Sequence, residues 1–329
     1  MNIFISGSTG FIGEKLCNKL ADEGHTIHAL YRSESKINKL KRTNIIPVKG
    51  DILDPESLYN GMQNCEVVFH TAAFTSVWTK NVYEIYRLNV VGTSNIISAA
   101  RKAGVKKVIC TSTAGVIGPS EDHEARSENS VKPLKFFNHY ESSKALLEEI
   151  ISSCTSYGPE IIMVNPTRVY GPGALNQSNS VTKMIRSYIL GKWKIVPGNG
   201  KSIGNYVYID DVVAGHIKAM EKGKPGERYV LGGENVSYNE FFNILSGVSG
   251  KKHFLFKVPV GILMTFSVLI FTFSLLFNKP PMITPSLVKK FNHNWIVSSD
   301  KAQNAIGYSS RSLHDGIKET VAWLKDQNK

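Results

Sequence analysis

The sequence has few of the features that mark several common protein classes. Its cysteines, Cys17, Cys65, Cys110 and Cys154, show no CxxC or comparable metal-ligand spacing, so we expect reduced structural thiols and no metal site. It contains no internal repeat and no low-complexity segment. An apolar strand pattern begins at Asn2 and leaves no room for a signal peptide, which predicts a cytoplasmic location.

Acidic residues are also scarce, with 27 against 39 lysines and arginines, so the net charge is +12. Such a surface can attract nucleic acid, an anionic membrane or a phosphate-rich cofactor. The lysines are spread along the chain and are not interleaved with stacking aromatic residues, so we expect no nucleic-acid partner. The densest basic group is typical of a solvated helix face and consists of Arg32, Lys36, Lys39, Lys41 and Arg42.

A glycine-rich turn stands between the first predicted strand, residues 3–5, and the first predicted helix, residues 11–23. Gly7 permits a tight turn, Gly10 lets the backbone approach a pyrophosphate, and Gly13 lets the helix lie close to the sheet. The N–H groups at a helix N-terminus attract anions. The segment therefore predicts a phosphate-binding turn.

Strand and helix patterns alternate up to residue 165, and repeated βα units of this kind predict an α/β fold with a doubly wound parallel sheet. Further strands are expected at residues 25–31, 45–48, 67–70, 107–112 and 161–165, and long helices at residues 83–103 and 140–157. From Pro166 on, proline and glycine interrupt the pattern. We assign residues 1–165 to a nucleotide-binding domain and residues 166–329 to a smaller, mainly helical substrate domain, with residues 205–222 returning to the first.

Tyr140 and Lys144 are four residues apart on a predicted helix and so share one face. An adjacent ammonium stabilises a phenolate, so a tyrosine beside it can transfer its proton near neutral pH. Such a pair of residues also occurs on ordinary protein surfaces. Thr113 follows the strand at 107–112, where a doubly wound sheet binds its ligand. Asp51 and residues 72–74 border the same edge, whereas Asn89 lies inside a predicted helix.

Several motifs in order resemble the extended short-chain dehydrogenase/reductases, a family that includes dihydroflavonol reductases, 3β-hydroxysteroid dehydrogenases and nucleotide-sugar epimerases. The matching segments are 7–13, 50–51, 70–73, Asn89, 111–114, 140–144, 165–173 and 207–212. The resemblance implies a Rossmann fold, Tyr140 as the proton donor or acceptor, Lys144 as a ribose ligand that lowers the pKa of Tyr140, and Asn89 as a residue that maintains the site. Thr113 stands where the family usually has the serine that binds the substrate oxygen. The cofactor ligands implied are Gly7, Thr9, Gly10, Phe11, Ile12, Gly13, Arg32, Asp51, Ile52, Ala72, Ala73, Tyr140, Lys144, Pro166 and Val169.

Arg32 at the end of the second strand predicts NADP in preference to NAD, because an arginine there accommodates a 2′-phosphate and no carboxylate occurs before Glu34. Arg168 replaces the asparagine that nucleotide-sugar epimerases of the family use to bind a diphosphate. We therefore predict a reductase or dehydrogenase for a mainly apolar substrate that is steroid-, flavonoid- or lipid-like. The alternatives are a nucleotide-sugar epimerase or dehydratase, and a regulator that binds NADP without catalysis.

Residues 258–277 contain no charge and are long enough to span a bilayer. Two interpretations are favoured, a buried helix of the substrate domain and contact with a membrane surface. A true span would carry the C-terminal helix at 312–325 away from the fold. In relatives the helices that correspond to 83–103 and 140–157 pair two subunits, so the resemblance also implies a homodimer.

Overall fold

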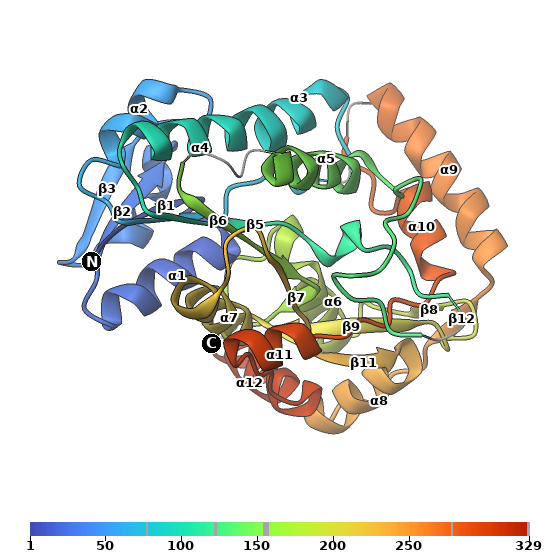
Figure 1. Cartoon of the computed structure of the whole chain (residues 1–329). Coiled ribbons are helices and arrows are strands. Elements are labelled where there is room, and N and C mark those ends of the chain that lie inside the picture. Colours follow the sequence, from blue (N-terminus) through green and yellow to red (C-terminus); the bar gives the residue numbers. More distant parts are fainter. Residues whose placement is uncertain (77, 122–123, 154–157, 278, 328–329) are drawn as a thin grey trace.

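Seven parallel strands form the central sheet of the computed structural model, which describes residues 1–76, 78–121, 124–153, 158–277 and 279–327 (Figure 1). The strands are β1 (Asn2–Ser6), β2 (Thr26–Tyr31), β3 (Ile45–Lys49), β4 (Val67–His70), β5 (Lys107–Thr111), β6 (Glu160–Pro166) and β10 (Arg228–Leu231). They lie in the order β10-β6-β5-β4-β1-β2-β3. The chain thus runs outward from β1 to one edge and then from β4 to the other, which confirms the predicted doubly wound fold.

Helices cover both faces of this sheet (Figure 1). The helices α1 (Phe11–Asp22) and α7 (Ile209–Lys222) pack together on one face, and α11 (Asp300–Ile306) packs on α7. The other face carries α2 (Pro55–Gly61), α4 (Gly92–Lys102) and α5 (His139–Ser153). Alternate residues of β1 supply the two cores, because Ile3 and Ile5 pack on the α1 side and Phe4 on the α4 side.

The predicted helix at 83–103 is present but is not regular. It consists of α3 (Val82–Tyr86), a π-helical turn at Arg87–Val91 and α4. A π-helical turn inserts one residue into the helical repeat and often occurs at functional sites. Asn89 lies in this turn and is fully buried. The end of the helix predicted at 140–157 falls outside the described residues after Ser153.

A second part of the molecule is built from residues after Pro166. It contains a three-stranded sheet of β7 (Arg168–Tyr170), β9 (Ile203–Tyr208) and β11 (Glu234–Ser237), and a pair formed by β8 (Ile195–Pro197) and β12 (Phe256–Val258). Its helices are α6 (Ser180–Ile189), α8 (Tyr238–Ser249), α9 (Val260–Phe277), α10 (Pro285–Phe291) and α12 (Leu313–Asp326). Three short 3₁₀ helices complete the described elements, at Glu34–Leu40, Ala114–Val116 and Gln177–Asn179.

The chain returns from this part to the central sheet. The helix α7 packs on the face of the large sheet, and β10 extends its edge beside β6. The strand β9, which precedes α7, belongs to the small sheet. The domain boundary at residue 165 stays a prediction.

The cysteines Cys17, Cys65 and Cys110 are buried free thiols, and burial raises their pKa values. Cys154 lies outside the described residues.

Candidate active site

The glycine-rich turn joins β1 to α1 in a shape that only glycine permits. Gly7 has a φ of 75°, and a Cβ atom there would lie 2.6 Å from the amide nitrogen of Ala72. A Cβ atom at Gly13 would lie 2.1 Å from the carbonyl oxygen of Gly7. Ser8 donates a hydrogen bond of 2.6 Å to the Leu30 carbonyl and so fixes the turn against β2. Gly10 is the N-cap of α1 and offers no side-chain acceptor, which leaves the first N–H groups of the helix for an anion.

Most of the other predicted cofactor ligands, and the predicted catalytic residue Thr113, lie at the carboxyl edge of the sheet. Arg32, Asp51, Ala72, Ala73, Thr113 and Pro166 all follow or end a strand of the parallel sheet, so the register brings them to one edge. Val169 lies nearby on β7 and is half-buried. Thr9 and Ile12 are half-buried in the glycine-rich turn, whereas Phe11 is buried. The residues present therefore fit a dinucleotide, because a glycine cradle and a row of strand ends meet at one edge.

Arg32 and Asp51 face each other across the ends of β2 and β3. Their charged atoms are 3.6 Å apart, and the Arg32 side chain is 73% exposed, so the pair contributes little stability. Asp51 also accepts a hydrogen bond of 2.9 Å from the amide of Leu53. The neighbouring Ile52 packs on Gly92 of α4, where a Cβ atom would lie 2.8 Å from it. The Asp51 carboxylate is thus held in place while Arg32 remains accessible.

Tyr140 and Lys144 both point from α5 toward the end of β5. Lys144 is 1% exposed, and its ammonium donates a hydrogen bond of 2.8 Å to the carbonyl of Thr111. Burial lowers the pKa of Lys144. Tyr140 is half-buried, and its hydroxyl lies beside that of Thr113. Burial and then the charge of Glu141 raise the pKa of Tyr140, so its lowering by Lys144 stays a prediction for the complex with a cofactor.

Two neighbouring hydroxyl groups after β5 have different surroundings. Ser112 is buried and donates a hydrogen bond of 2.6 Å to the carboxylate of Glu148. Thr113 is half-buried, accepts a hydrogen bond of 3.1 Å from the amide of Gly115, and contacts Tyr140. The hydroxyl of Thr113, and not that of Ser112, therefore lies beside the tyrosine.

Asn89 joins three segments around the site. Its carboxamide accepts a hydrogen bond of 2.7 Å from the amide of Phe74 and donates one of 3.2 Å to the carbonyl of the same residue. It also donates a bond of 2.9 Å to Ser143, whose hydroxyl donates to the carbonyl of Tyr140 at 2.7 Å. The amide thus ties the loop after β4 to the helix that carries the tyrosine.

A model of the NAD dependent epimerase/dehydratase family matches residues 3–232. The chain belongs to this family. A relative from Synechocystis sp., named as a candidate dihydroflavonol 4-reductase, is 29% identical over 98% of this chain and 94% of its own. A 3β-hydroxysteroid dehydrogenase/decarboxylase from Arabidopsis thaliana is 29% identical over 85% of this chain and 68% of its own. The UDP-glucose 4-epimerase of Thermotoga maritima superposes with a TM-score of 0.82, at 25% identity and full coverage of both chains.

The family match and these relatives confirm that the chain is an extended short-chain dehydrogenase/reductase, an oxidoreductase that uses an NAD(P) cofactor.

Several residues that support the site of this epimerase/dehydratase-family enzyme were not predicted. Glu148 of α5 is 1% exposed and binds Ser112, Asn165 and Arg228 at 2.6 to 2.8 Å. This network joins α5 to three strands of the sheet.

Glu141 is the second unpredicted residue, and it stands directly beside the tyrosine. It is 2% exposed, accepts a hydrogen bond of 3.1 Å from the amide of Phe137, and forms an ion pair with Lys290 of α10. Charged residues 141, 144 and 148 share a helix face with apolar residues 145 and 151, and all five are buried. That spacing in the sequence could have indicated that these charges face inward.

Arg168 has partners within the chain that bear on the question of a nucleotide-sugar substrate. One terminal nitrogen of its guanidinium donates to the hydroxyl groups of Tyr206 and Tyr238 at 3.1 and 3.2 Å. The guanidinium also lies over both aromatic rings. Among the described residues, no cluster of three or more metal-ligating side chains occurs.

Proposed function

We propose that this enzyme interconverts a carbonyl group and an alcohol on a mainly apolar substrate that is steroid-, flavonoid- or lipid-like, with NADP(H) as the cofactor. The observation that carries the proposal is that the hydroxyl groups of Tyr140 and Thr113 lie beside each other at the carboxyl edge of the sheet, the edge that also holds the glycine-rich turn. The named activities of the reductase and steroid dehydrogenase relatives support the reaction class.

Each residue then has a chemical task. The bound nicotinamide supplies or accepts a hydride. In the reducing direction Tyr140 gives its hydroxyl proton to the oxygen on which negative charge develops, and Thr113 donates a hydrogen bond to the same oxygen. The ammonium of Lys144 favours the phenolate that Tyr140 leaves behind. Gly7, Gly10 and the N-terminus of α1 hold the pyrophosphate.

The choice of NADP rests on Arg32. Its guanidinium is mostly exposed and follows β2, where it can form charge-assisted hydrogen bonds with a 2′-phosphate. The weak pair with Asp51 is the only ion pair of Arg32 among the described residues, so a phosphate has little to displace.

A nucleotide-sugar epimerase is the second candidate, because the Thermotoga maritima epimerase is similar over the whole chain. The position of Arg168 argues against it. Its guanidinium is engaged by two tyrosine hydroxyl groups and two rings, which makes it less available to a diphosphate. An epimerase would also keep its cofactor bound and show no net redox turnover.

The test is NADPH oxidation by wild type and Tyr140→Phe with soluble ketones, sterols and flavonoid-like carbonyl compounds, beside UDP-glucose epimerisation. We expect the variant to lose all but a small fraction of turnover and to bind NADPH as wild type does, because only the proton-transferring hydroxyl is lost. Tyr83→Phe is the control, because Tyr83 is exposed on α3. Epimerisation without NADPH oxidation would favour the second candidate.

We further propose a cytoplasmic homodimer that pairs through the α3–α4 segment and α5. Exposed apolar side chains on these helices support this interface, namely Tyr83, Val91 and Leu146. Two subunits would then bury the same patch around a twofold axis. A monomer mass from light scattering at micromolar concentration would contradict the dimer.

A further inference from the structure

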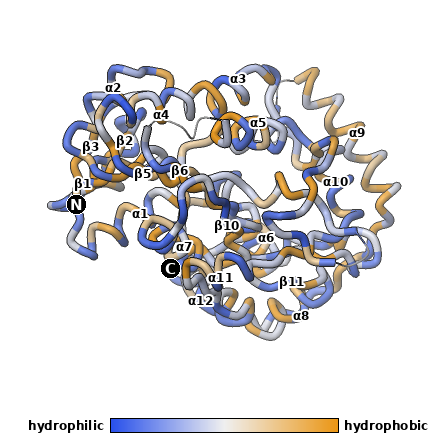
Figure 2. Tube along the Cα trace, viewed as in Figure 1, coloured by the Kyte–Doolittle hydropathy of each residue, from blue (hydrophilic) through white to orange (hydrophobic). Residues whose placement is uncertain are grey.

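The helix α9 exposes an apolar face and buries a partly polar one. Only 17% of its 18 residues are buried, so it is not a core helix of the substrate domain. The buried positions are Leu263, Ser267 and Ser274, and Ser267 donates its hydroxyl to the carbonyl of Met264 at 2.8 Å. Six large side chains are more than half exposed, namely Ile262, Phe266, Leu269, Phe273, Leu276 and Phe277. Figure 2 shows α9 at the outer edge of the molecule.

The exposed apolar surface continues beyond both ends of α9. Phe254 and Phe256 precede the helix and Met282 follows it, and all three are well over half exposed. So many exposed apolar side chains in one segment are unusual on a protein surrounded only by water. They therefore call for a partner with an apolar interior.

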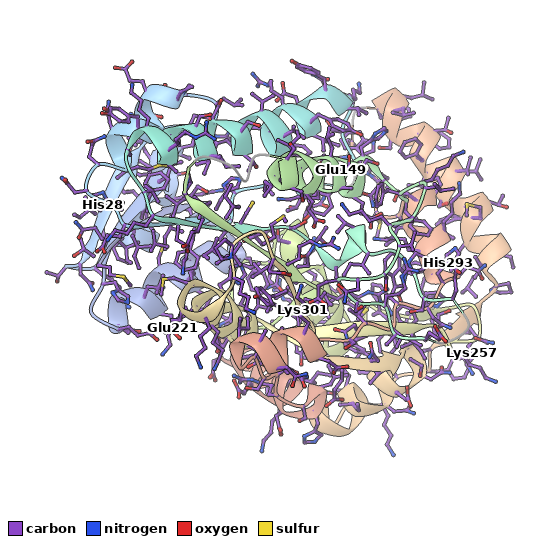
Figure 3. The ribbon with its side chains drawn as sticks, in the orientation of Figure 1. His28, Glu149, Glu221, Lys257, His293 and Lys301 are labelled. Atoms are coloured by element: carbon purple, nitrogen blue, oxygen red, sulfur yellow. The ribbon has the colours of Figure 1, made fainter. Side chains whose placement is uncertain are left out.

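The charge around this surface has one sign. Residues 241–299 contain six lysines and no aspartate or glutamate. Lys290 is paired with Glu141, whereas Lys251, Lys252, Lys257, Lys279 and Lys289 are exposed and form no ion pair within the described part of the chain. Lys257 lies on the side of the molecule that α9 borders (Figure 3). An anionic partner would complement these lysines.

Both ends of α9 are attached to the same folded body. Before the helix, β12 pairs with β8, and the Gly198 amide donates to the Val258 carbonyl at 2.8 Å. After it, Thr284 caps α10 and the Trp295 amide donates to the Ile203 carbonyl at 2.8 Å. At about 1.5 Å per residue the helix is roughly 27 Å long, close to the bilayer core of about 30 Å. A span would place its ends on opposite sides and break these contacts.

We propose that α9, together with Phe254, Phe256 and Met282, lies flat in the surface of an anionic lipid bilayer, from which the enzyme takes its substrate. A second copy of this chain is a poorer occupant, because it would bring the same lysines to the interface without acidic residues to meet them. Lipid headgroups supply the negative charge, and acyl chains accept the apolar side chains.

The docked helix is connected to the candidate active site through one neighbouring helix. The helix α10 packs against α9 (Figure 1). Its Lys290 pairs with Glu141, the neighbour of Tyr140. Phe137, just before α5, packs on His293 with ring centroids 5.2 Å apart. Docking through α9 therefore brings the segment beside the tyrosine close to the lipid. The substrate part of this inference rests on the proposed function, whereas the docking part does not.

The test is cosedimentation of the full chain with vesicles of phosphatidylcholine, with and without phosphatidylserine. We expect binding to the anionic vesicles, and at least tenfold weaker binding for the triple variant Phe266→Ser, Leu269→Ser, Phe273→Ser. The matched control replaces exposed apolar residues elsewhere, Val131→Ser with Leu134→Ser, and should bind as wild type does. Replacing Lys251, Lys252 and Lys257 by glutamine should weaken binding, whereas the same change at Lys183, Lys318 and Lys325 should not.

Two further measurements make the result decisive. The triple variant should retain turnover of a water-soluble ketone and lose efficiency only with a carbonyl substrate dissolved in the vesicles. The docking proposal would be overturned if the wild-type protein stayed in the supernatant. It would also be overturned if the wild-type protein bound no vesicles and formed a dimer that the triple substitution dissociates. Vesicle binding can be measured without any enzymatic turnover. A protein that binds the vesicles but does not oxidise NADPH would therefore contradict the proposed function and leave the docking proposal intact.

Discussion

Thr113 accepts a hydrogen bond from the amide of Gly115 and lies beside Tyr140. We expect Thr113→Ser to be mild, because the hydroxyl is kept. Thr113→Ala should lower kcat by about 100-fold or more, because the developing oxyanion loses a donor. Steady-state kinetics with NADPH measure both. Ser112→Ala is the control, since it removes a bond to Glu148 and should lower the melting temperature more than kcat. If Thr113→Ala is harmless, Ser112 is the better candidate.

Arg32 allows a test of cofactor choice at a single side chain. Arg32→Asp should reverse the preference from NADP to NAD, because it removes a cation from the 2′-phosphate and offers a carboxylate to the ribose 2′-hydroxyl. Binding titrations with each cofactor measure the change. Lys36→Asp introduces the same charge change at another exposed residue and should leave the ratio of affinities nearly unaltered. Equal NADP affinity in wild type and Arg32→Asp would mean that Arg32 is an ordinary surface residue.

At the scale of elements, the Glu141–Lys290 pair connects α5 to α10 beside the tyrosine. Lys290→Met leaves a buried carboxylate unpaired, which should cost about 3 kcal/mol of stability. It should also move the limb of the pH–rate profile that reports Tyr140 to higher pH, because the Glu141 charge raises the pKa of Tyr140. Glu141→Gln should move that limb to lower pH, and the double variant should resemble Glu141→Gln.

The control for this prediction is Lys301→Met, which breaks a pair with Glu227 far from the tyrosine. It should change stability without moving the pH profile. Lys144 also faces the end of β5 and is intact in every variant. A Lys290→Met enzyme that is less stable but has an unchanged profile would limit the pair to a structural role.

How far the sequence predicts an element depends on the range of the interactions that form it. The strands β1 and β4 are apolar runs with clear ends, and Tyr140 and Lys144 lie one helical turn apart, so local pattern suffices for both. The strand β10 has only four residues and was not predicted. Glu141 and Lys290 are 149 positions apart, a pairing that no local pattern indicates. The composition of α9 predicts a helix but not which of its faces is covered.

At the scale of the whole molecule, two buried histidines predict a loss of stability in acid. His70 lies between Ser6 and Thr93, and His216 between Thr111 and Val212. Burial lowers the pKa of His70 to about 3 and that of His216 to about 4. The unfolded chain binds protons below a pKa of about 6.5 while the folded chain does not. Each histidine should therefore cost about 1.4 kcal/mol per pH unit below that value, down to its folded pKa.

Urea unfolding from about pH 7 down to about pH 5 measures this slope, within the range where both histidines contribute. His216→Gln should remove about half of the loss between these pH values. His314→Gln should remove none of it, because His314 is exposed on α12. A wild-type slope that His216→Gln leaves unchanged would assign the acid sensitivity to carboxylates.

The repeated crossing of the chain between its two sheets has a consequence for dissecting the protein into fragments. A fragment that ends after β6 loses β10, so β6 becomes an unpaired sheet edge. It also loses α7, so the face of the sheet that Val212, Val213 and Ile217 cover becomes exposed to solvent. Open edges and bare apolar faces lead chains to associate with one another. We therefore expect a single cut at residue 165 to give an aggregating nucleotide-binding fragment, whereas in the uncut chain β10 and α7 cover this edge and this face.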